Sequence, residues 1–282
     1  MRTPVTPITI LRWAAGGAGP ADDLLVTEEP LEVRLGHGPL DDRRELRLSV
    51  TMRTPGHDAE LVLGFLLTEG LIDGPEDVVR VVPCADVHPE ERGNVVRAEL
   101  RPEVAVDPAR WQRNFYTTSS CGVCGKSSIE AVHVRCRRPL RPPADPDPAL
   151  ITALPERMRQ AQTVFRHTGG IHAAALCNRA GELLILREDV GRHNAVDKVI
   201  GALIDPGHTS ADGAPGQRTT DDLQLLVSGR AGFELVQKCV VAGIPVMAAV
   251  GAPSSLAVQL ARESGLHLFG FVRDGRCNRY AP

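Results

Sequence analysis

Leu223-Gln-Leu-Leu-Val227-Ser-Gly-Arg-Ala-Gly232 is the stretch of sequence that decides the fold. Its first five residues are mostly apolar and have the length of a buried strand, and small polar residues separate them from a helical pattern over 232–242. Further strands are predicted over 245–250 and 266–272, with a helix over 254–263 between them. This alternation is typical of a layered α/β sheet with crossover connections.

The residues before this stretch extend the same domain. A hairpin is predicted from strands over 171–177 and 182–186 that turn at 179–181, and a helix follows over about 193–203. Asp147 is a suitable N-cap with Pro148 at the first helical position, so another helix is predicted to begin there and to end near residue 162.

The first hundred residues are richer in strand patterns. Alternating apolar and polar residues predict strands at 24–27, 31–35, 45–52, 78–82 and 94–100, with one helix over 58–69. We therefore expect a mixed α/β fold of four parts. They are a flexible N-terminal segment (1–20), a smaller β-rich N-terminal subdomain (21–115), a reactive cysteine loop with a linker (116–147) and the α/β domain (148–282).

Composition excludes several classes of protein. The 282 residues carry a net charge of −3 and only 4% aromatic residues, so neither nucleic acid nor a membrane surface is expected as a partner. No run approaches the ~20 apolar residues of a membrane-spanning helix, and no signal peptide is recognisable. Seven scattered cysteines do not form a secreted disulfide framework, which favours a reducing cytoplasm.

Two of these cysteines stand apart, in Thr117-Thr-Ser-Ser-Cys121-Gly-Val-Cys124-Gly-Lys126. A glycine follows each cysteine and permits a bent, exposed loop, while Lys126 and Arg113 favour the reactive thiolate over the thiol. We therefore predict a reactive sulfur site at Cys121 and Cys124, with no resident metal. The other cysteines include Cys177 and Cys239, which occupy apolar positions and are expected to be buried.

Three other uses of the cysteine pair stay open from the residues alone. Structural zinc would need more ligands, such as Cys84, His133 or Cys136, and none of these is paired. A zinc deaminase would place His88-Pro-Glu90 on a helix, although this segment reads as a turn. A thioredoxin-like redox pair would begin a helix, which the flanking glycines oppose.

A ligand is expected where the strands of the α/β domain end. Val227-Ser-Gly-Arg-Ala-Gly232 and Val250-Gly-Ala-Pro-Ser-Ser255 each join a strand to a helix N-terminus, which favours anions. The last strand would bring a third segment to this edge if it runs parallel to its neighbours. Its residues are Phe271, Val272, Arg273, Asp274, Gly275 and Arg276. An Asp-Gly turn between two arginines suits a pyrophosphate, because guanidinium groups match phosphate geometry.

A dense polar cluster lies between the predicted hairpin and the helix after it. Its members are Glu188, Asp189, Arg192, His193 and Asn194, and His172 opens a neighbouring strand. These residues would either face a ligand or serve as N-cap and ion-pair residues for the following helix. His172 by itself is more often a packing histidine.

Five motifs together resemble the FdhD family of sulfur carrier proteins required for formate dehydrogenase activity. They are Cys121-Gly-Val-Cys-Gly125, Thr168-Gly-Gly-Ile-His-Ala173, Glu188-Asp-Val-Gly-Arg-His-Asn-Ala-Val-Asp-Lys198, Ser228-Gly-Arg-Ala-Gly-Phe-Glu-Leu-Val-Gln-Lys238 and Ala252-Pro-Ser-Ser-Leu-Ala257. The resemblance covers about residues 24–280, and the Gly/Pro-rich loop over 206–220 is longer than is usual in the family.

The resemblance implies a sulfurtransferase. Cys121 would accept a persulfide sulfur from a cysteine desulfurase, with Cys124 as its companion. The sulfur would pass to the molybdenum (or tungsten) bis(molybdopterin guanine dinucleotide) cofactor, bound through its GDP-like moieties at 271–276, before formate dehydrogenase receives it. The resemblance also implies a homodimer and a three-layer, cytidine deaminase-like sheet with helices on both faces. The alternative is a non-catalytic cofactor-binding chaperone with a structural metal or a redox cysteine pair.

Overall fold

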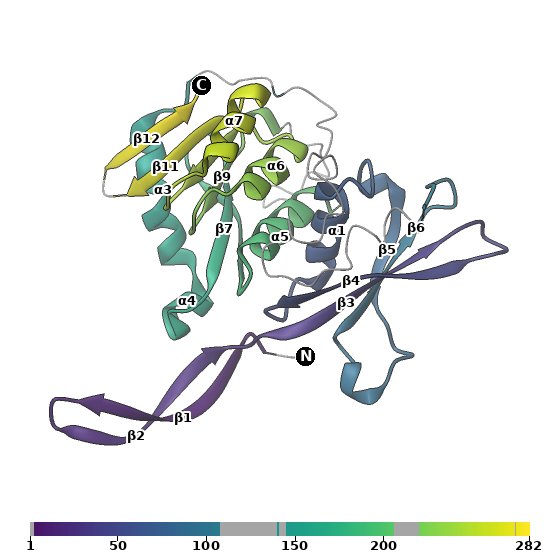
Figure 1. Ribbon diagram of the computed structural model, residues 1–282, viewed down its shortest axis with the longest axis horizontal. Coiled ribbons are helices and arrows are strands. Elements are labelled where there is room, and N and C mark those ends of the chain that lie inside the picture. The colour runs from purple at the N-terminus through teal and green to yellow at the C-terminus, as the bar shows by residue number, and fades with distance from the viewer. Residues whose placement is uncertain (1–2, 108–139, 141–144, 206–219, 274) are drawn as a thin grey trace.

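The computed structural model describes residues 3–107, 140, 145–205, 220–273 and 275–282. The larger part of the molecule is built on a six-stranded sheet of order β12-β11-β10-β9-β7-β8 (Figure 1). Its strands are β7 (His172–Cys177), β8 (Leu183–Asp189), β9 (Gln224–Val227), β10 (Val246–Ala249), β11 (His267–Arg273) and β12 (Arg276–Ala281). Strands β9, β10 and β11 are parallel, whereas β7 and β12 pair antiparallel with β9 and β11, so the sheet is mixed.

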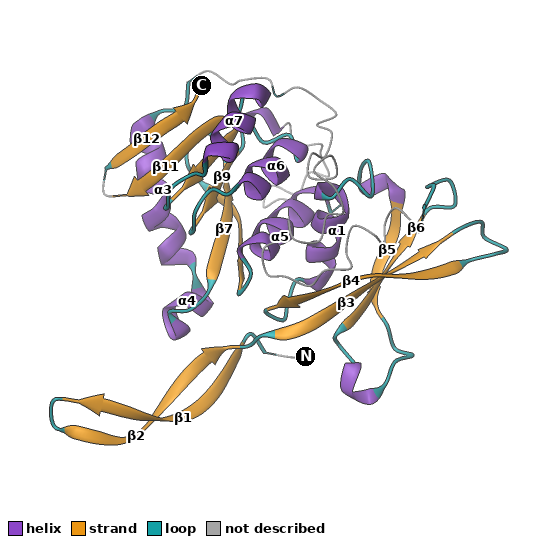
Figure 2. Cartoon of the chain, viewed as in Figure 1, coloured by secondary structure: helices purple, strands orange, loops and turns teal. Residues whose placement is uncertain are grey.

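Helices cover both faces of this sheet (Figure 2). One face packs on α5 (Arg192–Ile204), α6 (Phe233–Val241) and α7 (Ser255–Ser264). The other face packs on α3 (Pro148–Ala161), which is followed by the short helix α4 (Thr163–Thr168). Neighbouring residues of one strand point to opposite faces, so Leu225 joins the first core and Leu226 the second. Both side chains are fully buried, and the expected three layers are confirmed.

A smaller sheet of order β4-β3-β6-β5 forms the N-terminal part. Its elements are β3 (Glu29–His37), β4 (Arg44–Arg53), β5 (Val78–Pro83) and β6 (Val95–Leu100), with the 3-10 turns Pro75–Asp77 and Pro89–Glu91. Helix α1 (Asp58–Thr68) packs on one face of this sheet, where leucines from strand and helix, such as Leu35 and Leu66, are fully buried. The expected β-rich N-terminal part is confirmed.

Two glycines allow the two parts to pack closely. Helix α1 lies between the small sheet and α5. Gly64 of α1 lies against the backbone of α5, and Gly201 of α5 lies against the backbone of α1. A Cβ atom on Gly64 would overlap the carbonyl oxygen of Asp197, and one on Gly201 would overlap that of Glu60. Larger side chains would force these helices apart, so the contact depends on glycine.

The N-terminal segment differs from the sequence-based expectation. Instead of a loosely held segment over 1–20, β1 (Val5–Ala14) and β2 (Gly17–Val26) form an antiparallel hairpin with ten residue pairs in unbroken register. It projects from the body of the molecule (Figure 1). The expected boundary at residue 20 therefore falls inside β2. Pro, Gly and Ala made the segment look irregular, but the Thr and Ile residues between them support extended backbone.

Most predicted elements of the α/β domain are confirmed to within one or two residues. Asp147 caps α3 by accepting a hydrogen bond from the backbone N–H of Ala149 at 2.9 Å. The parallel direction of β11, on which the position of 271–276 depended, is also confirmed. The sequence-based prediction omitted α4 and β12, because α4 has only six residues and β12 contains three polar residues among its six.

Candidate ligand-binding edge

Three segments meet where the parallel strands end, as predicted. Residues 228–232 follow β9, residues 251–254 follow β10, and residues 271–273 and 275–276 complete β11 and lead into β12; we call these three segments the carboxyl edge. Backbone hydrogen bonds join them, from Gly251 N–H to the Gly229 carbonyl (2.9 Å) and from Phe271 N–H to the Gly251 carbonyl (3.1 Å). The carboxyl edge is therefore one connected surface.

The N-termini of α6 and α7 open onto this edge. Gly232 is the N-cap of α6, and Ser254 is the N-cap of α7, where its hydroxyl accepts the N–H of Ala257 at 3.3 Å. The N–H of Ser254 itself donates to the carbonyl of Ala231 at 3.1 Å, which holds the two helix starts together. Backbone dipoles of both helices thus favour negative charge at the carboxyl edge.

Phe271 is the distinctive backbone position of the edge. Its φ is +52°, a left-handed conformation that non-glycine residues rarely adopt, and its side chain is 38% exposed. In the described residues, only His57 shares this feature among non-glycine residues. Such strain persists only where surrounding structure imposes it, and it clusters at functional sites. Here the hydrogen bond from Phe271 N–H to the Gly251 carbonyl anchors the backbone at this position.

Two other predicted residues of this segment, Arg273 and Arg276, end β11 and begin β12. Arg273 and Arg276 are paired in register across the β11–β12 hairpin, and both are exposed. Gly275 has φ +71°, as an Asp-Gly turn requires, while Asp274 lies outside the described residues. Val272 is fully buried in the core beneath α3, so its side chain is a packing residue and only its backbone is near the edge.

His172 begins β7 beside the carboxyl edge. Strand β7 runs antiparallel to β9, so its first residue lies next to the segment that follows β9. The Ser228 hydroxyl accepts the N–H of Ala173 at 2.9 Å and fixes this contact. A Cβ atom on Gly229 would lie 3.7 Å from His172 Nδ1, so the imidazole borders the glycine loop.

Burial lowers the pKa of His172, and the nearby positive groups Arg192 and His193 lower it further. Asp189, its cross-strand partner, acts in the opposite direction. The imidazole of His172 is therefore predominantly neutral at neutral pH.

His193 forms an ion pair that ties two helix N-termini together. Its Nε2 lies 2.8 Å from Oε2 of Glu234, and both side chains are largely buried. His193 is in the first turn of α5 and Glu234 in the first turn of α6, both on the side of the sheet where β9 ends. A carboxylate in this position orients the imidazole.

The other members of the polar cluster hold the fold together. Glu188 accepts the backbone N–H groups of Thr163, Val164 and Phe165 and so caps α4. Both predicted roles of this cluster therefore occur. Glu188 caps a helix, whereas Arg192 and His193 lie near the edge.

Asp189 and Asn194 also serve the structure. Asp189 is fully buried and contacts Lys198 Nζ at 2.7 Å, and it accepts the N–H of Gly191 at 2.8 Å. Asn194 donates to the Met52 carbonyl at 2.7 Å. Asp189 and Asn194 therefore connect α5 to the neighbouring strands and loops.

The predicted sulfur site at Cys121 and Cys124 lies outside the described residues, as do Arg113 and Lys126. Of the other cysteines, Cys177 and Cys239 are buried, as predicted. Burial raises the pKa of Cys177 to about 11 and also raises the pKa of Cys239, so neither is a reactive thiolate at neutral pH.

The described residues give no support to the two alternative zinc hypotheses, a structural zinc site and a zinc deaminase. His88 and Glu90 flank the start of an exposed 3-10 turn, not a helix that presents a ligand inward. Among the residues with described positions, no group of three or more metal-ligating side chains comes together. In the same part of the chain, no helix is long and apolar enough to cross a bilayer.

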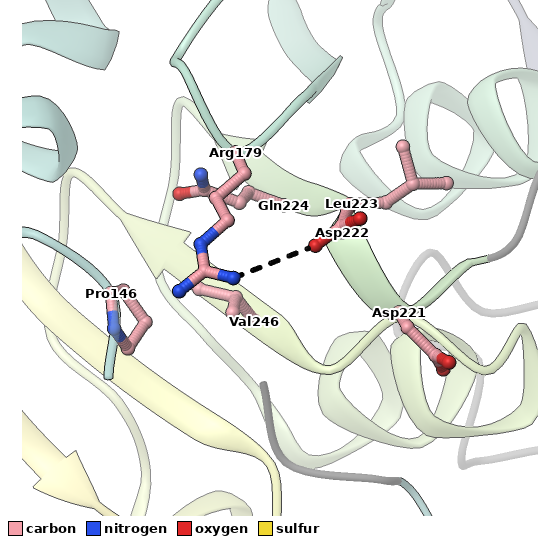
Figure 3. A pocket seen from close by; sticks show the side chains of 7 residues that line it. All are labelled: Pro146, Arg179, Asp221, Asp222, Leu223, Gln224 and Val246. Atoms are coloured by element: carbon pink, nitrogen blue, oxygen red, sulfur yellow. Dashed lines mark ion pairs between the residues drawn. The ribbon is translucent and has the colours of Figure 1, made fainter. Parts of the chain in front are cut away.

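A shallow pocket lies at the opposite edge of the sheet, where β9 and β10 begin (Figure 3). Gln224 and Val246, the first residues of these strands, line it together with Arg179 and Asp222. Arg179 and Asp222 form an ion pair at 3.8 Å and are both exposed. In an α/β sheet, ligands gather at the carboxyl ends of the strands, so this pocket is not the favoured site.

Residues 26–282 match the model of the FdhD/NarQ family. The chain belongs to the FdhD/NarQ family. It is 48% identical over 276 residues to the sulfur carrier protein FdhD of Streptomyces avermitilis, covering 96% of this chain and 92% of the relative. It is 50% identical over 279 residues to the protein of the same name from Mycolicibacterium paratuberculosis, covering 96% and 94%.

A solved structure shows the same fold for a distant protein. The crystal structure of a protein assigned as a formate dehydrogenase accessory protein, from Desulfotalea psychrophila, superposes with a TM-score of 0.70. The match covers 99% of this chain and 98% of the other at 23% identity. Membership of the FdhD/NarQ family and its mixed α/β fold, both expected from the sequence, are thus confirmed.

Sequence reasoning did not single out Glu234 or Ser228 as individual residues of the site. Each lies in a motif that was quoted for the resemblance, but their contacts join elements far apart in the chain. Ser228 reaches β7 and Glu234 reaches α5. The sequence does place an acidic residue in the first turn of α6. Such a residue is equally expected as a favourable partner of the helix dipole, so it did not indicate the contact with α5.

Proposed function

We propose that this member of the FdhD/NarQ family is a sulfurtransferase that acts as a sulfur carrier for the cofactor of formate dehydrogenase. Cys121 accepts a sulfur atom as a persulfide from a cysteine desulfurase, and Cys124 assists it. The sulfur is passed to the molybdenum bis(molybdopterin guanine dinucleotide) cofactor, which is cargo here and not a resident group. The relatives named as sulfur carrier proteins support the general role.

The carboxyl edge is the structural observation that carries the cofactor part of this proposal. Two helix N-termini and two exposed arginines, Arg273 and Arg276, converge where the parallel strands end. Backbone N–H groups and guanidinium groups are the groups that bind diphosphates in proteins. The guanine dinucleotide arms would supply such diphosphates, and 271–276 would receive them.

The chemistry of the residues also fits the sulfur step. A persulfide forms when the carrier thiolate attacks the outer sulfur of a persulfide on the desulfurase, which breaks the donor's S–S bond and releases the donor cysteine as a thiolate, so the carrier cysteine must ionise readily. Buried Cys177 and Cys239 are unsuited to this, because burial raises the pKa of each. Cys121 has Lys126 and flanking glycines in its sequence surroundings and is the better candidate.

Mass spectrometry after incubation with a cysteine desulfurase and cysteine tests the proposal. The parent protein should gain one sulfur atom on the peptide that contains Cys121, and Cys121→Ala should not. Cys177→Ala is the matched control and should keep the adduct. Retention of the same adduct in Cys121→Ala would contradict the assignment.

Metal analysis of the same samples addresses the non-catalytic alternative. Stoichiometric zinc without titratable thiols at Cys121 and Cys124 would indicate a cofactor-binding chaperone with a structural metal. A reversible disulfide between the two cysteines would indicate a redox pair. A homodimer in the cytoplasm belongs to the same proposal, and sedimentation of the purified protein tests the dimer.

A further inference from the structure

The carboxyl edge has a titratable cluster that the proposed sulfur chemistry does not use. His172 from β7, Arg192 and His193 from α5 and Glu234 from α6 come from three elements and lie beside residues 228–232. Of these, His193 is committed to Glu234, with 2.8 Å between Nε2 and Oε2. His172 differs, because no described residue forms a hydrogen bond with its ring nitrogens.

The geometry leaves the His172 imidazole accessible to a ligand at the edge. Gly229, which borders Nδ1, has no side chain, so the ring faces a glycine loop. The ring is only half-buried, at the first residue of β7. A packing histidine normally has both nitrogens satisfied or its ring enclosed, and the described residues provide neither for His172.

The charges around His172 favour its neutral imidazole form when no anion is bound. Arg192 and His193 of α5 oppose its protonation, and so does burial, while Asp189 of β8 favours it. An anionic group placed among these residues would reverse the balance, because it attracts a proton to the nearby imidazole. Arg230 of the loop after β9 adds positive charge on the same side.

We infer that His172 is a proton-linked contact for an anionic group, such as a diphosphate, bound at the carboxyl edge. Binding of the anion would be accompanied by uptake of one proton from water onto the imidazole, with one N–H bond formed and no electrons exchanged. This inference deepens the proposed function, since it rests on an anionic ligand at this edge. It does not depend on the sulfur step.

The affinity for the anion is expected to decrease as the pH rises. The pKa of His172 is higher in the complex than in the free protein, so binding is strongest below the free-state pKa. The affinity then falls, by up to tenfold per pH unit, as the pH rises through the bound-state pKa. Glu234 is a positioning residue here, because its carboxylate holds the His193 imidazole at 2.8 Å.

NMR of the full chain, with histidine rings labelled, tests the inference directly. The ring signals are followed against pH without ligand and with inorganic pyrophosphate or guanosine diphosphate. His172→Gln identifies the signal of His172 among the nine histidines. The expected result is an apparent pKa of His172 that rises by at least one unit on addition of pyrophosphate.

Calorimetry in two buffers of different ionisation enthalpy counts the protons taken up. His172→Gln should lose about one proton of uptake relative to the parent and keep only the pH dependence of the phosphate itself. An unchanged His172 pKa on saturation with either probe, or equal proton uptake in parent and variant, would overturn the inference. Failure of pyrophosphate and guanosine diphosphate to bind at all would also overturn it.

The outcome is separable from that of the sulfur proposal. If no sulfur adduct were found on Cys121, the pyrophosphate titration of His172 would be unaffected. Conversely, a His172 pKa that ignores pyrophosphate would leave persulfide formation at Cys121 intact.

Discussion

The junction between the two sheets and the carboxyl edge use charged residues in opposite ways. At the junction, Lys198 is buried and pairs with Asp189 at 2.7 Å, and it also donates to the Thr54 carbonyl at 2.8 Å. At the edge, Arg273 and Arg276 are exposed, and no acidic side chain among the described residues forms an ion pair with them. Paired charges hold two parts of the molecule together, whereas uncommitted charges remain available to a ligand.

A second buried cluster strengthens the junction. Lys238 of α6 contacts Asp197 of α5 at 3.0 Å and Glu69 after α1 at 3.1 Å, and it donates to the Thr68 hydroxyl at 2.8 Å. Burial disfavours a charged lysine, but Asp197 and Glu69 outweigh this effect and raise the pKa of Lys238. Three helices thus share one lysine, and the run of residues 188–198 contributes both to this junction and to the edge.

The largest effect is expected from breaking the buried pair at the junction. Lys198→Met leaves Asp189 without its cation in a buried site, which should lower the free energy of unfolding by about 3–5 kcal/mol. Urea denaturation measures it. The control Arg273→Ala, at an exposed position, should change stability by no more than about 0.5 kcal/mol.

The double variant Asp189→Asn/Lys198→Met sharpens this comparison. It removes both charges and should recover part of the lost stability, because no unpaired charge stays buried. A loss below about 1 kcal/mol in Lys198→Met would show that the pair does not hold the junction together.

The next effect tests the glycine contact between α1 and α5. Gly201→Ala places a methyl group against the carbonyl oxygen of Glu60, and overpacking of this kind costs about 1–3 kcal/mol. Gly170→Ala is the matched control, since its added methyl would lie 3.7 Å from the Thr168 carbonyl oxygen, an ordinary contact. Equal midpoints of thermal unfolding for the two variants would contradict the close packing of the helices.

A smaller, pH-dependent effect is expected at the ion pair between α1 and β8. Burial alone would raise the pKa of Glu60, but hydrogen bonds from Arg187, with Nη2 at 2.6 Å from Oε1, and the neighbouring His57 lower it from 4.5 to about 2. Because the folded-state pKa is lowered, this stability is present above pH 4.5 and is lost as the pH falls toward 2.

Arg187→Gln should therefore reduce stability at pH 7 and flatten the part of the acid-induced loss that begins below pH 4.5, because Arg187 no longer lowers the pKa of Glu60. Urea midpoints between pH 7 and pH 3 measure the change. Arg179→Gln breaks an exposed ion pair instead and should leave the pH profile unaltered. Identical profiles for the parent and Arg187→Gln would refute the role of this pair.

The difference between junction and edge also explains what could be predicted from the sequence. Local patterns were enough for most of the strands and helices of residues 148–272, although not for α4. They were also enough for the convergence of three loops, since this follows from strand direction. They were not enough for the roles of Asp189 and Arg192. Both lie in one polar run, and only the tertiary contacts show that the first is buried and paired and the second lies near the edge.

The N-terminal hairpin shows a second limit. Its pairing partners, Val5 with Val26 through Ala14 with Gly17, are local, yet its strands bury little and carry exposed Leu11 and Trp13. Hydrophobic periodicity reports burial, so a strand that is exposed on both faces gives no alternating pattern. Residues 1–20 therefore looked irregular in the sequence.

Calorimetric titration of guanosine diphosphate tests the claim that the carboxyl edge receives the nucleotide phosphates. Each guanidinium supplies a charge-assisted contact of about 1.5–3 kcal/mol, so Arg273→Ala/Arg276→Ala should bind at least a hundredfold more weakly than the parent. Arg179→Ala, at the opposite edge of the sheet, should bind like the parent. An affinity of the double variant equal to that of the parent would contradict the account.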